Sequence, residues 1–489
     1  MFESIIEAVL HYANTQPDKL CLADDTSKVS YKEYAEKIRK YATCFENAGL
    51  VRGDKIVVEA CQTIDYLAIE LAMQAIGMVF VPVEHNCASE KIQSFIDRAE
   101  AKAVIVTKAF DYAVEHNYTY DKFNEMYANA EAYNITELPK KEDISEILFS
   151  TGTTGKEKGI VLTHKNDIAL AENVMYGVEM EKDTVEMIPS PLNHSHGLRR
   201  YYANMYNGST VILLGSVMNI KKFFSNMDEY GVNAMDLVPT AMSVVLKLTK
   251  NRLAEYADKI QYIQLGAAPL LEDDKNKICE LLPNTRLYNF YGSTESGCTC
   301  IYNFNCADSK TRCIGKPTHN TTVIIVDDDR NEIKSSETNT GLLATKGDMN
   351  MSYYWQDEEE TSKVLIDGIV YSNDIAYIDD NGEVILMGRK GDVINVGGNK
   401  VSPDEIENVA KKMDVVADCG CIPIPDKSKG SVPKLFVEME NGKEFDPVEI
   451  RKFLASQLEP YKIPTVIVEI DKIPRSFNGK ILRKDLQNL

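Results

Sequence analysis

Short apolar runs alternate with helix-type patterns near the start of the chain, and this alternation constrains the fold more than any other feature of the sequence. Residues 55–59, 79–83 and 103–107 are apolar and rich in β-branched side chains, which is typical of strands buried on both faces. Residues 31–48 and 64–76 have the apolar spacing of helices. Strands connected through helices pair in parallel, so the pattern predicts a doubly wound α/β sheet.

A second series of the same kind follows and predicts a second α/β subdomain beside the first. Its strands are expected at residues 147–149, 210–214, 234–238 and 262–265, with a helix beginning near Lys165. A chain of 489 residues is long enough for more than one core, at roughly 100–200 residues per domain.

The character of the sequence changes at about Cys306. Strand–turn–strand segments continue to about Met387 and predict a β-rich lobe. Four glycines within residues 388–398 suit a hinge, and the segments after it predict a small α+β domain. The predicted division is therefore a large domain of residues 1–388 and a small domain of residues 389–489.

Charge argues against some classes of partner. The chain has 54 Lys and Arg against 74 Asp and Glu, a formal net charge of −20. A surface this acidic repels nucleic acid and anionic lipid, although local loops can still hold a small anion. The first residues carry no signal-peptide pattern and no apolar run approaches the roughly 18 residues of a membrane span. We therefore expect a cytoplasmic protein without a membrane span or a nucleic-acid partner.

The eleven cysteines are expected to be reduced thiols. Cys298, Cys300, Cys306 and Cys313 are close in sequence, but their spacing is not the paired CxxC of a zinc ribbon. A metal site and a set of scattered small hydrophobic side chains are both compatible with this pattern, and the second is favoured.

Residues 150–159, STGTTGKEKG, follow an apolar strand and have the composition of an anion cradle. Glycines let the backbone approach a ligand, while N–H groups and hydroxyls point at phosphate oxygens. The segment is not a Walker A loop, because its glycine and lysine spacing differs. A flexible polar turn is the alternative on composition alone.

The segment resembles the phosphate loop of the adenylate-forming (AMP-binding) superfamily, which includes acyl-CoA and aryl-CoA synthetases, peptide-synthetase adenylation domains and firefly luciferase. The family pattern is [ST]-[ST]-G-[ST]-T-G-x-P-K-G, and Glu157 stands where proline is usual. The resemblance implies that the loop binds the phosphates of ATP, with Thr154 also a Mg²⁺ ligand. The loop residues so implied are Ser150, Thr151, Gly152, Thr153, Thr154 and Lys158.

Further family motifs follow in the family's order. Residues 289–295, NFYGSTE, resemble a motif in which Tyr291 stacks on adenine, Thr294 contacts the α-phosphate and Glu295 holds Mg²⁺. Asn289 and Gly292 belong to the same nucleotide-binding motif.

Residues 266–270, GAAPL, resemble the turn that lines the adenine and acyl pockets. The resemblance assigns Gly266 and Ala267 to the nucleotide, and His194, Gly266 and Ala268 to the acyl pocket.

The remaining motifs lie near the hinge and at the C-terminal end. By the same resemblance, Asp374 in YSND binds the ribose hydroxyls and Arg389 binds a ribose hydroxyl or phosphate. Gly391 occupies the hinge position, about which the C-terminal domain would rotate. Lys480 in residues 474–486 is the lysine that stabilises charge during adenylation.

The resemblance implies an AMP-forming acid–thiol ligase that uses ATP, Mg²⁺ and CoA. A carboxylate would attack the α-phosphate of ATP to give an acyl-adenylate, and CoA would then take the acyl group as a thioester. A stand-alone enzyme that loads a carrier-protein phosphopantetheine is the alternative. A nucleotide-binding pseudoenzyme is a third possibility, opposed by the presence of Lys480, Glu295 and Asp374.

The acid itself is weakly specified. His194 is expected to be a wall residue of the acyl pocket without a role in proton transfer. His196, Arg199 and Arg200 are expected to face solvent, or else one of them binds a second polar group of the substrate. These polar residues favour a short, aromatic or polar acid over a long-chain fatty acid.

Overall fold

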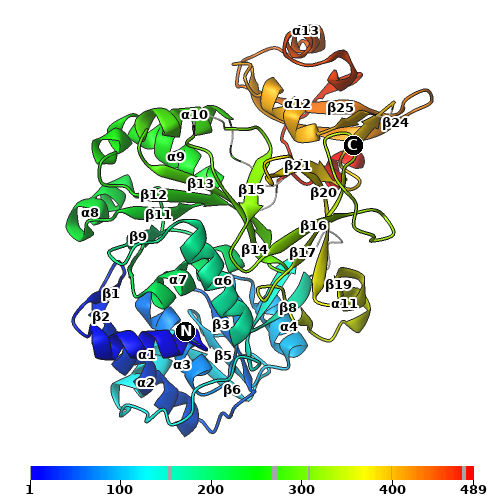
Figure 1. The fold of residues 1–489 in the computed structure, drawn as a ribbon. Coiled ribbons are helices and arrows are strands. Elements are labelled where there is room, and N and C mark those ends of the chain that lie inside the picture. Colours follow the sequence, from blue (N-terminus) through cyan, green and yellow to red (C-terminus); the bar gives the residue numbers. More distant parts are fainter. Residues whose placement is uncertain are drawn as a thin grey trace.

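The computed structural model describes residues 2–151, 157–266, 270, 272–306, 309–397, 399–475 and 481–489, with the side chains of Thr151 and Lys400 excepted. These residues form three sheets with helices packed around them (Figure 1). The predicted fold class, two α/β subdomains with a β-rich lobe and a small α+β domain, is confirmed.

The first sheet corresponds to the first predicted subdomain. Its spatial order is β18 (Tyr353–Tyr354), β8 (Glu157–Thr163), β7 (Ile144–Thr151), β4 (Val79–Val83), β3 (Lys55–Glu59), β5 (Ala103–Val106) and β6 (His116–Thr119). The strands from β7 to β6 pair in parallel, whereas β8 and β18 run antiparallel.

Successive residues of β3 enter two different cores, which explains its continuous apolar sequence. Ile56 and Val58 join the core that contains α1 (Ile5–Thr15), α2 (Tyr31–Asn47) and α3 (Ile64–Ala75). Val57 joins the core under α4 (Ser89–Ala99). A strand buried on both faces has no polar alternation, so the sheet is doubly wound as predicted.

The second sheet is longer than the second predicted subdomain. Its order is β16 (Thr322–Val326), β17 (Gly341–Lys346), β20 (Ile369–Ile378), β21 (Val384–Arg389), β15 (Cys313–Pro317), β14 (Gly297–Asn303), β13 (Arg286–Ser293), β12 (Tyr262–Gly266), β11 (Ala234–Leu237), β9 (Val185–Ile188), β10 (Thr210–Leu213), β1 (Leu20–Ala23) and β2 (Lys28–Ser30), with β19 (Leu365–Ile366) on β20. The β-rich lobe therefore continues the α/β sheet through the β14–β15 and β15–β21 pairs.

The helices that follow α4 complete the large domain. They are α5 (Tyr120–Ala128), α6 (His164–Gly177), α7 (Ser195–Asn207), α8 (Ile220–Tyr230), α9 (Pro239–Thr249), α10 (Glu272–Leu281) and α11 (Glu358–Val364), with a 3₁₀ turn at Arg252–Tyr256. Helix α7 is almost entirely buried, because it lies between the two subdomains rather than on the surface (Figure 1).

The third sheet is built from strands that follow Arg389. Its order is β23 (Asn399–Val401), β22 (Ile394–Val396), β25 (Gly430–Met439) and β24 (Val416–Asp426), with β26 (Val466–Glu469) on β25. It packs with α12 (Pro403–Ala410), α13 (Pro447–Gln457) and α14 (Arg483–Gln487), and a 3₁₀ turn spans Pro460–Lys462. This part is orange to red in Figure 1 and projects from one end of the large domain.

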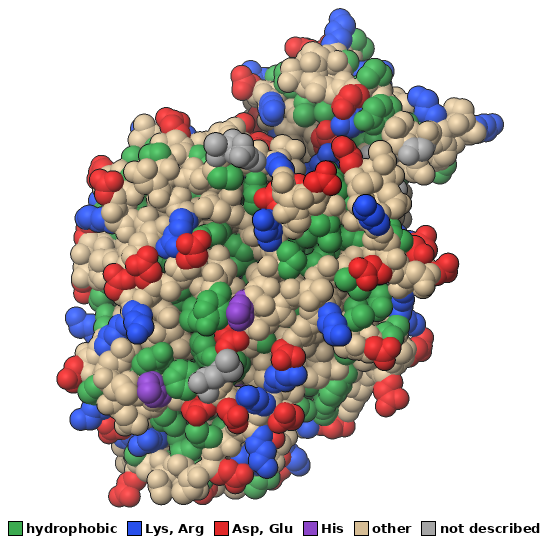
Figure 2. All heavy atoms as spheres, viewed as in Figure 1, with side chains coloured by type: hydrophobic (Ala, Val, Ile, Leu, Met, Phe, Trp, Pro, Cys, Tyr) green, Lys and Arg blue, Asp and Glu red, His purple; other side chains and the backbone are tan. Residues whose placement is uncertain are grey.

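On the face drawn in Figure 2, acidic and basic side chains are interspersed. No helix in the described part of the chain is long and apolar enough to cross a membrane.

Candidate functional site

Three residues predicted from separate motifs meet through their side chains: Tyr291 of β13, Asp374 of β20 and Arg389 of β21. Asp374 and Arg389 are direct partners in the register of β20 and β21, and Arg389 Nε lies 3.3 Å from Asp374 Oδ1. The hydroxyl of Tyr291 on β13 donates a hydrogen bond to Asp374 Oδ2. Burial and then the charge of Asp374 raise the pKa of Tyr291 well above its usual range, so the phenol keeps its proton. The carboxylate is thus held from two sides.

The YSND sequence orients Asp374 locally. The hydroxyl of Ser372 accepts a hydrogen bond from the N–H of Asp374 at 3.0 Å and donates to the carbonyl of Leu343 at 2.7 Å. Ser372 therefore fixes the backbone of β20 beside the carboxylate, even though the family usually has another sequence here.

Glu295 is positioned by an aromatic residue that the sequence did not single out. The hydroxyl of Tyr354 donates to Glu295 Oε1 at 2.9 Å, and the carbonyl of Glu295 accepts from the N–H of Met351 at 2.8 Å. Burial and then Glu295 raise the pKa of Tyr354, which keeps it a donor. The second carboxylate oxygen, Oε2, has no hydrogen-bond partner within the described residues and remains available to a ligand.

Lys158 lies next to the same tyrosine. Its ammonium is 4.9 Å from the ring centroid of Tyr354 and 2.5 Å from Glu360 Oε2 on α11. Lys158 and then Lys363 lower the pKa of Glu360 to about 2. Lys158, Tyr354 and Glu295 therefore form a contiguous row beside the end of the β7–β8 hairpin.

The β7–β8 hairpin places the predicted phosphate loop. Ser150 is paired with Lys158 and Thr151 with Glu157 across the hairpin. The predicted loop residues Gly152, Thr153 and Thr154 lie outside the described residues.

Glu157, the departure from the family pattern, ties the hairpin to helix α4. Its carboxylate lies 2.9 Å from Lys91 Nζ and 3.5 Å from Arg98 Nη1. Arg98 Nη2 also donates to the carbonyl of Glu157 at 2.6 Å. Two cations and a main-chain contact thus hold the residue at which β8 begins.

Two of the predicted acyl-pocket residues lie at the ends of elements, Gly266 at the end of β12 and His194 at the start of α7. Gly266 is the last residue of β12, and a Cβ atom there would lie 2.8 Å from Cε1 of His196, so the close approach requires glycine. His194 is the N-cap residue of α7, and burial lowers its pKa. A neutral, half-buried imidazole suits the predicted wall residue. Ala267 and Ala268 lie outside the described residues.

The other residues of the NFYGSTE motif occupy the β13–β14 hairpin. Asn289 is paired with Leu265 of β12 on one side and with Tyr302 of β14 on the other. A Cβ atom at Gly292 would lie 1.8 Å from the carbonyl oxygen of Gly297, so no other residue fits there. Thr294 is half-buried in the turn that follows.

The expectation that Arg199 and Arg200 face solvent is wrong. Arg199 is 2% exposed and pairs with Glu146 and with Asp167 Oδ1, the latter at 3.1 Å. Arg200 is fully buried and donates to both carboxylate oxygens of Glu186. The preference of arginine for the surface is overridden because carboxylates from β7, α6 and β9 converge on α7. Both guanidinium groups are occupied by the protein.

His196 is also mostly buried, with 11% of its side chain exposed.

The cysteines of the Cys298–Cys313 segment do not cluster. Cys298, Cys300 and Cys313 pack into three different hydrophobic clusters, while Cys306 is exposed.

At the predicted hinge, Gly391 has a backbone φ of +96°, a left-handed conformation that favours glycine.

The predicted adenylation residue Lys480 lies outside the described residues. Arg483, three positions later, pairs with Glu407 and with Asp404 at 2.5 Å, which fixes α14 against α12.

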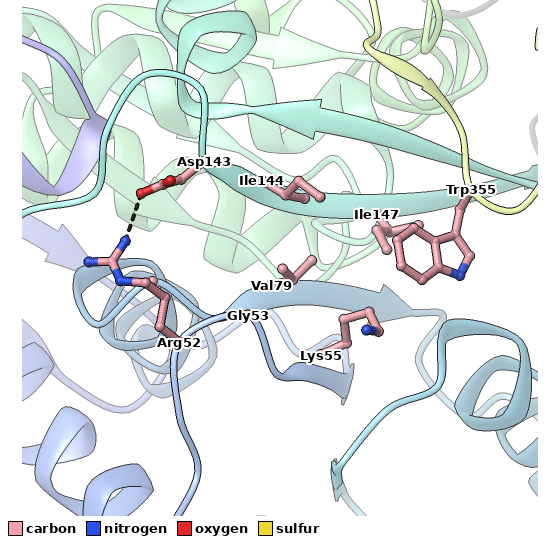
Figure 3. Close-up of a pocket in the computed structure, with 9 residues that line it drawn as sticks. Arg52, Gly53, Lys55, Val79, Asp143, Ile144, Ile147 and Trp355 are labelled. Carbon is pink, nitrogen blue, oxygen red and sulfur yellow. Dashed lines mark hydrogen bonds and ion pairs between the residues drawn. The ribbon is translucent and has the colours of Figure 1, made fainter.

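A separate pocket opens at the opposite ends of the first-sheet strands (Figure 3). Lys55, Val79 and Ile144, the first residues of β3, β4 and β7, line it together with Trp355. Arg52 and Asp143 close one end through an ion pair of 2.7 Å. Because ligands of α/β sheets bind at the carboxyl ends of the strands, this pocket is not part of the candidate site.

Two family models match most of the chain. Residues 9–355 match the family model described as AMP-binding enzyme, and residues 405–480 match the AMP-binding enzyme C-terminal domain. The 4-coumarate–CoA ligase 1 of Petroselinum crispum is 26% identical, over 96% of this chain and 91% of the relative. The 4-coumarate–CoA ligase of Vanilla planifolia is also 26% identical, over 92% of this chain and 86% of the relative.

Solved structures share the whole fold. The ATP-bound MatB structure from Rhodopseudomonas palustris superposes with a TM-score of 0.89 at 23% identity, over 100% of this chain and 99% of that chain. The o-succinylbenzoate CoA synthetase (MenE) of Bacillus subtilis, in complex with its acyl-adenylate intermediate, gives a TM-score of 0.86 at 21% identity, over 99% and 98%.

Proposed function

Because the chain belongs to the AMP-binding enzyme family, we propose that it is an AMP-forming acid–thiol ligase that makes a CoA thioester. The carboxylic acid would be activated by ATP as an acyl-adenylate and then transferred to CoA. The curated relatives named above are CoA ligases and match over most of their own length. The observation that carries the proposal is the convergence of Tyr291, Asp374 and Arg389 from three strands.

The nucleotide would lie across the ends of β12 and β13. Asp374 is a carboxylate with acceptor capacity beyond its contacts to Tyr291 and Arg389, as ribose hydroxyls require. Tyr291 offers its ring to adenine while its hydroxyl anchors Asp374. Ser150, Thr151 and Lys158 flank the predicted phosphate loop on the two strands of its hairpin.

The donor set fits Mg²⁺ bound through ATP. Within the described residues no three His, Cys, Asp or Glu side chains converge as a metal cage. Mg²⁺ in nucleotide enzymes is commonly held by one or two carboxylates plus the phosphates, and Glu295 Oε2 supplies such an oxygen. When bound, the ion would neutralise phosphate charge, while Tyr354 keeps the Glu295 carboxylate in place. Thr154 remains the second proposed ligand.

The second half-reaction would use rotation of residues 389–489 about Gly391. In the adenylating state Lys480 would face the α-phosphate and stabilise the charge that develops there. Rotation of the C-terminal domain would move this lysine away from the active site and bring another segment of the domain there to line the tunnel for the thiol. A separate carrier protein bearing phosphopantetheine is the alternative thiol acceptor. All eleven cysteines are unpaired, which suits the reducing cytoplasm that we propose as the location.

Carboxylate-dependent ATP–pyrophosphate exchange tests the proposal. A panel of short, aromatic, dicarboxylic and long-chain acids should give exchange with at least one acid, and the same acid with CoA should give a thioester. Exchange without CoA turnover would support carrier-protein loading instead. Retained ATP binding without exchange on any acid would overturn the ligase assignment in favour of a nucleotide-binding protein.

A further inference from the structure

A histidine–carboxylate pair lies at the carboxyl ends of the second-sheet strands and has no role in the function proposed so far. His196, the second residue of α7, places Nε2 2.9 Å from Asp236 Oδ1. Asp236 lies on β11 and is fully buried. Its other oxygen, Oδ2, accepts a hydrogen bond from Ser190 Oγ at 2.7 Å. A buried carboxylate is costly without a polar partner, so this pair is a specific arrangement.

The neighbouring ions do not compete for Asp236. Arg200 is the adjacent cation, but it donates to both oxygens of Glu186, and its Nη1 donates to Gln264 at 2.5 Å. Among the described residues, Ser190 is thus the hydrogen-bond donor to Asp236, and His196 lies in close contact with its other oxygen. Asp236 Oδ1 approaches Nε2 closely, but the N–H is not directed at it, since neither atom has a hydrogen-bond partner in the described part of the chain. The carboxylate therefore constrains the imidazole ring by charge and proximity, and Nδ1 is the nitrogen that faces away from it.

The Cε1–Nδ1 edge of the ring lies against Gly266, a predicted residue of the acyl pocket. A Cβ atom on Gly266 would lie 2.8 Å from Cε1 and 3.2 Å from Nδ1 of His196, so this edge packs directly on the end of β12. The ring of Phe290 lies 6.0 Å away, centroid to centroid. The described part of the chain gives Nδ1 no hydrogen-bond partner, and 11% of the side chain is exposed.

We propose that His196, oriented by Asp236, determines substrate specificity by hydrogen-bonding a second oxygen group of the acid, remote from the carboxylate that is activated. This inference rests on the proposed ligase function. A hydroxyl oxygen can donate to or accept from imidazole, whereas a second carboxylate accepts from the protonated ring. The hydroxyl and the second carboxylate both place a polar oxygen where a simple alkyl acid has only carbon. An apolar acid would leave Nδ1 unpaired, which disfavours its binding.

Matched acids separate these cases. Cinnamate is compared with 4-hydroxycinnamate, and hexanoate with adipate, by kcat/KM for pyrophosphate exchange. The wild-type protein should prefer the oxygen-bearing member of at least one pair by about 10- to 100-fold. A preference for 4-hydroxycinnamate over cinnamate would show recognition of a hydroxyl group. A preference for adipate over hexanoate would show recognition of a second carboxylate.

Variants of His196 and Asp236 test whether these two residues cause the preference for the oxygen-bearing acid. His196→Phe keeps a ring and removes both nitrogens, so the preference should fall by tenfold or more. Asp236→Asn should raise KM for the preferred acid with little change in kcat, because the carboxylate positions the imidazole without touching substrate. His116→Phe, on β6 at the far edge of the first sheet, is the matched control and should keep the wild-type preference. ATP binding measured by calorimetry shows that each variant is folded.

Two results would overturn the inference while leaving the ligase function intact. One is a wild-type protein that activates acids but shows no preference within either pair. The other is a His196→Phe variant that binds ATP and loses both members of a pair equally, which would indicate a structural role. Absence of exchange with every acid would instead refute the proposed function itself.

Discussion

Replacing Glu70 with glutamine should stabilise the protein increasingly as the pH rises. Glu70 lies on α3 and is fully buried. The hydroxyl of Tyr202 is hydrogen-bonded to Glu70 Oε1 and lies 3.0 Å from Glu146 Oε2. One hydroxyl hydrogen cannot serve two carboxylates. Since Glu146 is already paired with Arg199, Glu70 is the acid that must hold a proton and donate it to the phenol oxygen.

The charges of the cluster lead to the same assignment. Glu70, Glu146 and Asp167 face a single guanidinium, that of Arg199. Burial raises the pKa of Glu70 well above its usual range, and the charges of Glu146 and Asp167 raise it further. Burial and then Glu146 raise the pKa of Asp167 to about 8. The folded protein therefore holds protons that the unfolded chain releases at neutral pH.

The magnitude follows from proton linkage. An acid whose pKa is higher in the folded state stabilises the fold below its unfolded pKa, and this stabilisation is lost as the pH rises toward the folded pKa. For one proton, the free energy of unfolding falls by about 1.4 kcal/mol per pH unit in that window. Glutamine at position 70 does not titrate, so the difference between variant and wild type should grow by up to about 3 kcal/mol from pH 6 to pH 8.

Local hydrogen bonding allows the replacement. Gln74 Nε2 lies 3.3 Å from Glu70 Oε1, and Gln74 Oε1 is buried without a partner in the described residues. Turning the Gln74 amide would let its oxygen accept from the new amide at position 70.

Urea denaturation of the Glu70→Gln variant and wild type at pH 6, 7 and 8 measures the effect. Glu46→Gln, at an exposed position of α2, is the matched control and should follow wild type at each pH. A stability difference that does not change with pH, or a glutamine variant that loses stability as the pH rises, would refute a protonated Glu70.

Three further predictions concern the site. Asp374→Ala should weaken ATP binding by about 10- to 100-fold in calorimetry, because it removes charged acceptors for the ribose hydroxyls, and unchanged affinity would exclude that role. Glu157→Ala should raise KM for ATP about fivefold with kcat retained. Its ion pairs with Lys91 and Arg98, whose side chains are 44% and 35% exposed, contribute about 1 kcal/mol together to positioning the hairpin, and an unchanged KM would contradict this. Lys480→Ala should abolish adenylate formation yet leave thioester formation from supplied acyl-adenylate largely intact, and equal loss in both half-reactions would count against the assignment.

The elements of the fold were predictable because their local patterns are strong. The helix expected over residues 31–48 is observed at Tyr31–Asn47, with Ser30 and Glu33 forming a capping box at its start. The strands at 55–59 and 79–83 are observed with those bounds. Most side chains of a strand buried on both faces are apolar, so a run of β-branched residues marks its extent closely.

The connections between sheets were not predictable, because they depend on pairing between distant segments. The N-terminal hairpin β1–β2 pairs with β10 of the second sheet, although the sequence places it before the first. Tyr353–Tyr354 joins β8 of the first sheet from within the β-rich lobe. Neither pairing has a local signal, since the register is set by tertiary packing.

The same distinction applies to the site. Motifs identified Tyr291, Asp374 and Arg389, but only the register of β20 and β21 shows that the last two are direct partners. Tyr354 was missed as the residue that holds Glu295, since a tyrosine beside tryptophan in an edge strand is compatible with ordinary packing. Arg199 and Arg200 were misplaced because single-residue preferences cannot reveal carboxylates that converge from other elements.

Helix α7 links the buried ionic networks to the proposed specificity residue. Its first turn carries His196, and its next turn carries Arg199 and Arg200, each anchored to carboxylates on neighbouring elements. These ion pairs fix the position and rotation of the helix, because breaking a buried pair costs about 3–5 kcal/mol. A side chain on the first turn is then held in place before substrate arrives, as precise recognition requires. The two arginines that were expected to contact solvent or substrate would therefore serve the proposed acyl pocket indirectly, by immobilising the helix that carries His196.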